Sequence, residues 1–222
     1  MPDQPVEDSR RLVRAPARRA GRPPAPLRAI TKLFVVTGPS GAGKGTLIRA
    51  LIARRDDLEV AISATTRPQR PGEEDGKDYY FLSEEEFARG VEAGEFLEHV
   101  VYVSGQRYGT LRSEVERIHA AGKNCVLELE TKGARAVRDS EPSAVTIFIA
   151  PPSFDELERR LRDRATESSG EIEERLELAR EQMQEADDFD YVVLNDDVER
   201  AVTELDGIVT REVAGVGRLS AT

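Results

Sequence analysis

Cysteine and histidine are scarce in this chain of 222 residues, and this scarcity excludes two kinds of site. The single cysteine, Cys125, lies in an apolar stretch, so the chain cannot form an intramolecular disulfide framework. The two histidines, His99 and His119, do not show the spacing of metal ligands. We therefore expect no metal centre built from protein ligands, and we predict that both histidines are structural or surface residues.

Long hydrophobic runs are also missing. The longest apolar stretches, such as residues 145–152, are far too short to span a membrane, and we find no pattern of a secretory signal peptide. The net charge of −10 argues against broad, non-specific binding of nucleic acid by the folded part. A small phosphorylated ligand needs only a local basic pocket. We predict a cytoplasmic protein.

Residues 1–30 differ in composition from the rest of the chain. Residues 10–28 are rich in Arg, Pro and Ala, and three prolines between positions 23 and 26 prevent a regular helix. We predict a disordered basic arm. The favoured interpretation is a non-functional extension or a start codon placed too far upstream. An RNA-binding arm is the alternative, and a transit peptide fits less well because the first eight residues include three acidic ones.

Residues 38–46 read GPSGAGKGT and follow the apolar run LFVV at positions 33–36. Leu47, Ile48, Leu51 and Ile52 then recur at helical spacing. A strand, a glycine-rich turn and a helix together predict a phosphate-binding loop, whose backbone N–H groups and helix N-terminus surround phosphate oxygens. Lys44 would reach the terminal phosphates. Gly45 stands where a Ser or Thr usually binds magnesium, a variant that favours a nucleotide kinase over a GTPase or a motor ATPase.

Buried apolar strands alternate with helices along most of the chain, which predicts an α/β protein with a parallel sheet covered on both faces. Residues 63–122 interrupt this alternation and indicate an inserted α+β unit. We therefore predict a core of residues 31–62 and 123–222 and an insert of residues 63–122. We expect the polar residues of the insert to recognise the substrate.

Two segments of the insert are the most specific part of the sequence. Residues 63–80 read SATTRPQRPGEEDGKDYY, and residues 95–110 read EFLEHVVYVSGQRYGT. Together with the phosphate loop, the APPS turn at 150–153 and the NDD at 195–197, they resemble the guanylate kinase family over about residues 32–205. The resemblance implies a P-loop nucleoside monophosphate kinase fold with an inserted GMP-binding region and a mobile lid at about residues 162–175. It also implies the reaction ATP + GMP ⇌ ADP + GDP.

The same resemblance implies three groups of site residues. The ATP-binding residues are Gly38, Pro39, Ser40, Gly41, Ala42, Gly43, Lys44, Gly45, Thr46 and Asn195. The GMP-binding residues are Ser63, Arg67, Arg70, Tyr79, Glu98, Tyr108, Thr110 and Glu130. The catalytic residues are Lys44 and the lid arginines Arg164 and Arg175. Many members of the family have Asp where this chain has Glu130, and the family often has glycines beside the first lid arginine, where this chain has Asp163 and Ala165.

These assignments fit the chemistry of the substrates. Arg67 and Arg70 offer guanidinium forks to a phosphate dianion, and the Glu98 carboxylate can accept from both N1–H and the amino group of guanine. Magnesium would bridge the β- and γ-phosphates of ATP, largely through water. Two rival interpretations remain at this stage. One is a non-catalytic guanylate-kinase-like domain that binds a phosphorylated protein segment, which the intact loop disfavours. The other is a related kinase for another phosphorylated nucleoside or sugar.

Overall fold

The computed structural model describes residues 31–102, 105–163 and 169–219. Its larger sheet, the core sheet, has the strand order β2-β7-β1-β8-β9, and every neighbouring pair in it is parallel. Its strands are β2 (Leu58–Val60), β7 (Asn124–Glu128), β1 (Leu33–Thr37), β8 (Val145–Ala150) and β9 (Tyr191–Leu194). The predicted α/β fold with a parallel core is confirmed. The predicted basic arm lies outside the described residues.

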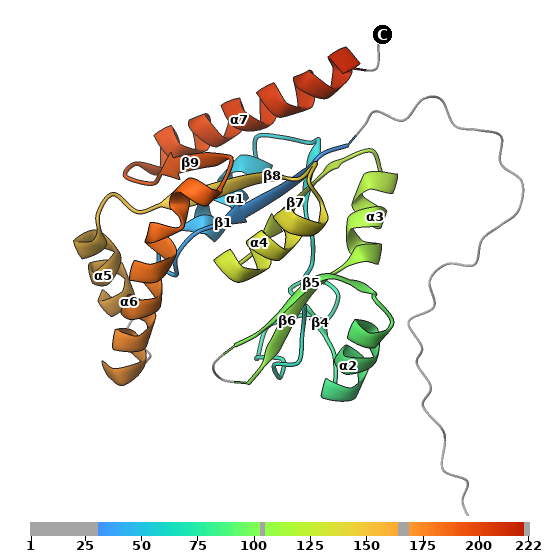
Figure 1. The fold of residues 1–222 in the computed structure, drawn as a ribbon, viewed down its shortest axis with the longest axis horizontal. Helices are drawn as coiled ribbons and strands as arrows, with labels where there is room; N and C mark the ends of the chain where they lie inside the picture. The colour runs from blue at the N-terminus through green and yellow to red at the C-terminus, as the bar shows by residue number, and fades with distance from the viewer. Residues whose placement is uncertain (1–30, 103–104, 164–168, 220–222) are drawn as a thin grey trace, which may run out of the picture.

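Helices cover both faces of the core sheet, which explains why its strands are apolar at nearly every position (Figure 1). Along β1, Phe34 and Val36 face one side and pack with α1 (Lys44–Ile52) and α7 (Val198–Leu219). The alternate residue Val35 faces the other side, with α3 (Arg112–Ala120) and α4 (Thr131–Ser140). A strand at the centre of such a sheet buries both sets of side chains.

A second, smaller sheet lies beside the core sheet (Figure 1) and has the strand order β4-β3-β6-β5. Its strands are β4 (Tyr80–Phe81), β3 (Ala64–Thr65), β6 (Arg107–Leu111) and β5 (Phe96–Val101). The β6 strand runs antiparallel to both β3 and β5, whereas β3 and β4 are parallel. All four strands come from the predicted insert at 63–122. The exact boundaries of core and insert stay a prediction.

Two further helices start where local sequence signals place them. The α2 helix (Glu84–Glu92) begins with a capping box, in which the Ser83 hydroxyl and the Glu86 carboxylate each accept a hydrogen bond from the backbone N–H of the other. This spacing of Ser and Glu is a local signal for the start of a helix. The α5 helix (Phe154–Asp163) has Ser153 accepting from the amide of Glu156 at 3.1 Å. It packs against α6 (Ser169–Gln184) through a separate apolar cluster, and a short 3-10 helix, η1 (Ala186–Asp188), follows.

A buried carboxylate connects the core to the second sheet at the point where the chain crosses between them. Glu114 in α3 accepts hydrogen bonds from the amide of Ile62 at 3.2 Å and from the hydroxyl of Tyr80 at 3.1 Å. Arg117 donates to both of its oxygens at 2.9 Å and also pairs with Glu59 of β2 at 2.6 Å. One carboxylate therefore holds residues of both sheets in a fixed relation.

We expect Glu114→Gln to destabilise the protein by about 2 kcal/mol, because the amide places a donor where Tyr80 and Arg117 need an acceptor. Burial alone would raise the pKa of Glu114, but the hydrogen bonds from Arg117 and the Ile62 amide lower it below its usual value. The stabilisation is therefore present above the ordinary pKa of a glutamate and is lost as the pH falls through the lowered value.

Thermal unfolding at pH 7 and at about pH 4 measures this contribution. The difference in melting temperature between wild type and Glu114→Gln should be large at pH 7 and should shrink at the lower pH. An equal difference at both pH values would show that the ionised carboxylate contributes nothing.

Candidate active site

The phosphate loop, residues 38–46, connects β1 to α1 and depends on glycine at two positions. Gly38 has φ +139°, and a side chain there would collide with the carbonyl oxygen of Ile149. Gly43 has φ +91° at the start of α1, and a side chain would meet the amide nitrogen of Asn195. Only glycine adopts such positive φ values without strain. The loop therefore curls tightly above the carboxyl end of β1, as the sequence pattern predicts.

Lys44 lies across this loop. Its ammonium group donates to the carbonyl oxygens of Gly38 at 2.7 Å and of Pro39 at 3.2 Å. Burial lowers the pKa of Lys44, and the carboxylates of Glu128 and Glu130 oppose this effect. The lysine is thus a poorly hydrated cation held at the centre of the loop, where an anionic oxygen would interact with it strongly.

Two predicted residues hold the loop from outside. Arg175 of α6 donates to the Ser40 hydroxyl at 2.6 Å. Asn195 follows β9 and donates from its side-chain amide to the carbonyl of Ala42 at 2.6 Å, and its side chain is buried. The structure thus places Asn195 behind the loop, where it supports the loop backbone. Arg164, the other predicted lid arginine, lies outside the described residues.

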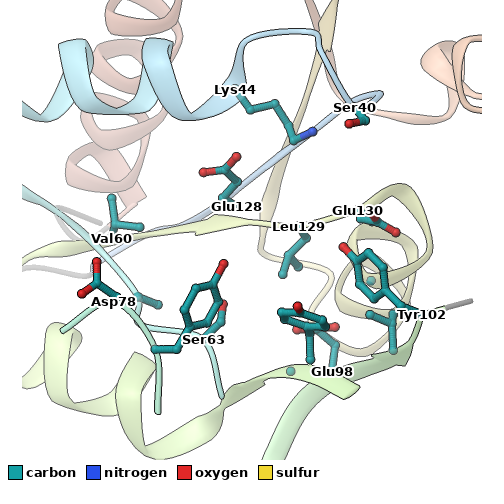
Figure 2. Close-up of a pocket in the computed structure, with 16 residues that line it drawn as sticks. Ser40, Lys44, Val60, Ser63, Asp78, Glu98, Tyr102, Glu128, Leu129 and Glu130 are labelled. Atoms are coloured by element: carbon teal, nitrogen blue, oxygen red, sulfur yellow. The ribbon is translucent and has the colours of Figure 1, made fainter. Parts of the chain in front are cut away.

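A cavity of about 420 Å³ opens below the loop, between the core sheet and the second sheet (Figure 2). Seven of the predicted residues line it, namely Ser40, Lys44, Ser63, Tyr79, Glu98, Tyr108 and Glu130. Figure 2 shows Lys44 on the loop side and Glu98 at the opposite end. Residues separated by more than eighty positions in the chain therefore share one cavity.

Glu98 supplies a buried acceptor at the far end of the cavity. It lies on β5 opposite Thr110 of β6, whose hydroxyl donates to one of its carboxylate oxygens at 2.9 Å. Only 5% of Glu98 is exposed. Burial raises the pKa of this carboxyl above its usual value, and the hydrogen bond from Thr110 opposes this effect only in part. The Glu98 carboxylate is therefore poorly hydrated and is ready to accept hydrogen bonds from a ligand.

Tyr79 and Tyr108 line the side of the cavity formed by the second sheet, and Arg67 lies beside them without lining the cavity itself. The guanidinium of Arg67 lies 5.4 Å from the ring centroid of Tyr79, whose ring is 6.0 Å from that of Tyr108. Glu73 pairs with Arg67 at 2.7 Å and raises its pKa, and Tyr108 contributes in the same direction. Glu73 also accepts from the backbone amide of Arg70 at 2.8 Å. Arg70 itself has an exposed side chain and does not line the cavity.

Several residues of this site belong to none of the predicted groups. Tyr102 lines the cavity, and burial together with the neighbouring Glu130 raises its pKa well above the usual value for tyrosine. Glu128 lies beneath Lys44 at the carboxyl end of β7 (Figure 2). Glu128 ends a buried strand, and a carboxylate at the carboxyl end of a parallel strand is a sequence signal for a ligand site. Nothing local marks Glu73, because only the fold brings it to Arg67.

A parallel sheet with a glycine loop and a lysine at the carboxyl end of its central strand defines a P-loop nucleotide-binding protein. The family described as guanylate kinase matches residues 30–212. The chain belongs to the guanylate kinase family. Guanylate kinases transfer a phosphoryl group from ATP to GMP, so membership makes this chain an ATP:GMP phosphotransferase.

Individual relatives agree with this membership. The chain is 49% identical over 182 residues to the guanylate kinase of Symbiobacterium thermophilum, covering 82% of this chain and 86% of the relative. It is 50% identical over 184 residues to that of Rubrobacter xylanophilus, covering 83% and 96%. The crystal structure of guanylate kinase from Anaplasma phagocytophilum superposes with a TM-score of 0.67 at 32% identity, covering 83% of this chain and 87% of that one.

Proposed function

We propose that the phosphate loop holds the phosphates of ATP while the cavity beneath it holds GMP, so that the phosphoryl group moves between them past Lys44. One observation carries this assignment: Lys44 of the loop and the buried acceptor Glu98 line the same cavity. A nucleotide has a charged phosphate at one end and a base at the other. Toward the loop the cavity offers the Lys44 ammonium and the Ser40 hydroxyl, with the Glu128 carboxylate beneath the lysine, and at the far end it offers the buried carboxylate of Glu98.

The phosphate of GMP would be held by Arg67, Arg70, Tyr79 and Tyr108. Guanidinium groups bind phosphate oxygens in pairs, and each tyrosine hydroxyl can donate one further hydrogen bond. The guanidinium of Arg67 already lies beside both tyrosines, because Glu73 holds it there. Arg70 is exposed and would have to turn its side chain toward the cavity when GMP binds.

The guanine base would be read by Glu98, with Ser63 and Thr110 supplying hydroxyls and Glu130 a second carboxylate. Guanine presents N1–H and its amino group as donors, which a single carboxylate accepts together. Adenine presents an acceptor at N1, so its lone pair would face the negative charge of Glu98. A buried carboxylate left without a donor discriminates strongly, by a factor on the order of 10⁴.

Transfer itself needs no general base, because the attacking oxygen of GMP is already ionised. The protein positions the two nucleotides and neutralises the charge of the moving phosphoryl group. We assign this neutralising role to three cations, Lys44, Arg164 and Arg175. Arg175 already reaches the loop through Ser40. Asn195 would act through the loop that it supports, close to the adenine of ATP.

Magnesium is the cofactor that we propose, bound mainly by phosphate oxygens and water. No group of three or more His, Cys, Asp or Glu able to hold a metal occurs among residues 31–102, 105–163 and 169–219. The donors near the loop fit a loosely held magnesium ion, since Glu128 offers carboxylate oxygens beside Gly45 and Lys44. Thr46, the next residue of the loop, offers a hydroxyl that accepts from Arg49 at 3.4 Å. When bound, the ion would neutralise charge on the β- and γ-phosphates.

A panel of nucleotide acceptors tests the proposed function. With ATP and magnesium, we expect GMP and dGMP to be phosphorylated and AMP and CMP to react at least about 10³-fold more slowly in kcat/KM. A coupled spectrophotometric assay of ADP release measures all four. Equal turnover of AMP and GMP would contradict the proposed reading of the base by Glu98.

We further propose that the enzyme acts in the cytoplasm, in purine nucleotide metabolism and the recycling of GMP. Among the helices in the described part of the chain, none is long and apolar enough to cross a membrane. ATP and GMP are the expected partners. Contact with nucleic acid is expected only through the basic arm.

A further inference from the structure

Gly133 lies against the carboxylate of Glu98 at the end of the cavity. It belongs to the first turn of α4, and it lines the cavity together with Glu98. A Cβ atom built on Gly133 would lie 2.8 Å from the outer oxygen of Glu98, Oε2, and 3.4 Å from its Cδ. The missing side chain is therefore what leaves room for this carboxylate.

The backbone gives no reason for glycine at this position. Gly133 is not among the glycines with positive φ, and it lies within a regular helix, where alanine is the better helix former. The next atom that such a Cβ would meet is the Cβ of Leu129, at an ordinary contact distance of 3.7 Å. The space that would suit a methyl group is occupied by the Glu98 carboxylate alone.

Glu98 has little freedom to move away from an added methyl group. Its other oxygen, Oε1, is fixed by the Thr110 hydroxyl at 2.9 Å, and both residues are buried. Turning the carboxylate would break this hydrogen bond, and shifting it would push it into the cavity. Either movement would change where the two oxygens meet a ligand.

We propose that Gly133 is a specificity-determining position, whose missing side chain allows both oxygens of Glu98 to face the N1–H and amino group of guanine. This inference rests on the proposed role of Glu98 as the guanine acceptor. Gly133 makes no polar contact of its own in this role, so it acts as a positioning residue.

Gly133→Ala should lower kcat/KM for GMP by about 10- to 100-fold, mainly through a higher KM, because a carboxylate displaced by a fraction of an ångström aligns poorly with the base. The KM for ATP should stay within about twofold, since the phosphate loop is untouched. The preference for GMP over IMP, which lacks the amino group, should also shrink. Steady-state kinetics with the three nucleotides measures these effects.

Gly207→Ala is the matched control. Gly207 is also a glycine inside a helix, α7, and a Cβ there would meet only the end of the Arg211 side chain at 3.6 Å. Both substitutions improve helix propensity, so a purely structural role predicts similar kinetics for both. We expect wild-type KM for GMP in Gly207→Ala and a raised one in Gly133→Ala.

Glu98→Asp provides a second, independent measurement. The shorter carboxylate leaves room for the methyl group, so Gly133→Ala should cost much less in the Glu98→Asp background than in the wild type. The same holds for folding: if Gly133→Ala alone fails to fold, the double variant should fold, and failure of both would overturn the proposal.

The outcomes also separate this inference from the proposed function. If Glu98→Gln loses activity toward GMP while Gly133→Ala keeps the wild-type KM, the role of Gly133 is refuted and that of Glu98 stands. If Glu98→Gln itself keeps wild-type activity, the proposed reading of guanine is wrong, and the inference falls with it.

Discussion

Lys44→Ala should lower the rate of phosphoryl transfer by about 10³-fold or more while the protein stays folded. The ammonium group of Lys44 lies at the centre of the loop, and burial has already removed much of its hydrating water. A charge in such a place stabilises an anionic transition state without first having to lose water. Measurement of kcat at saturating ATP and GMP tests the expectation.

The expected loss has to be separated from damage to the loop, because Lys44 also donates to the carbonyls of Gly38 and Pro39. GMP binding, measured by calorimetry, should survive in Lys44→Ala, since the acceptor half of the cavity is intact. Lys32→Ala is a control, because Lys32 lies outside the loop and its ammonium pairs with the Glu212 carboxylate at 3.4 Å. This variant should keep wild-type turnover. Undiminished turnover in Lys44→Ala would exclude the lysine from the chemistry.

Glu98→Gln should lower kcat/KM for GMP by about 10³- to 10⁴-fold and leave the KM for ATP nearly unchanged. The substitution keeps the size of the side chain but replaces one acceptor oxygen with a donor. That donor faces either Thr110 or the guanine N–H groups, and both of these need an acceptor. The buried mismatch cannot be repaired by water, because Glu98 is only 5% exposed.

The same experiment needs a control for the loss of a buried negative charge. Glu114→Gln removes a second buried carboxylate, one that contacts Ile62, Tyr80 and Arg117 and does not line the cavity. It should affect stability more than the use of GMP. A similar loss of GMP activity in both variants, or none in Glu98→Gln, would argue against direct contact between Glu98 and the base.

Much of the fold could be predicted because its signals are local. The apolar run before the loop, the glycines within it and the capping box at Ser83 each act within a few residues. The strand β6 carries no such signal, because Arg107–Leu111 is polar in part and becomes a strand only by pairing with β3 and β5. Strand propensity depends on such neighbours more than helix propensity does.

Site residues could be predicted where they belong to a sequence motif. They could not be predicted where the fold brings distant segments into contact. Seven of the predicted residues line the cavity, yet Glu73, Tyr102 and Gly133 carry no signal that a single sequence reveals. Asn195 directly follows β9, and its hydrogen bond to Ala42 depends on how β9 ends beside the loop. No short pattern encodes that arrangement.

The two sheets divide the chemistry of the cavity between separate stretches of chain. The phosphate loop belongs to the core sheet, whereas Glu98, Tyr108 and Thr110 belong to the second sheet, which is built from a continuous segment. Changes within that segment can therefore alter which acceptor is used without rebuilding the donor site. A designer who wished to redirect this kinase toward another nucleotide could keep the loop intact and exchange residues of the second sheet, and would then adjust Glu130 and Gly133 at the start of α4 on the core side.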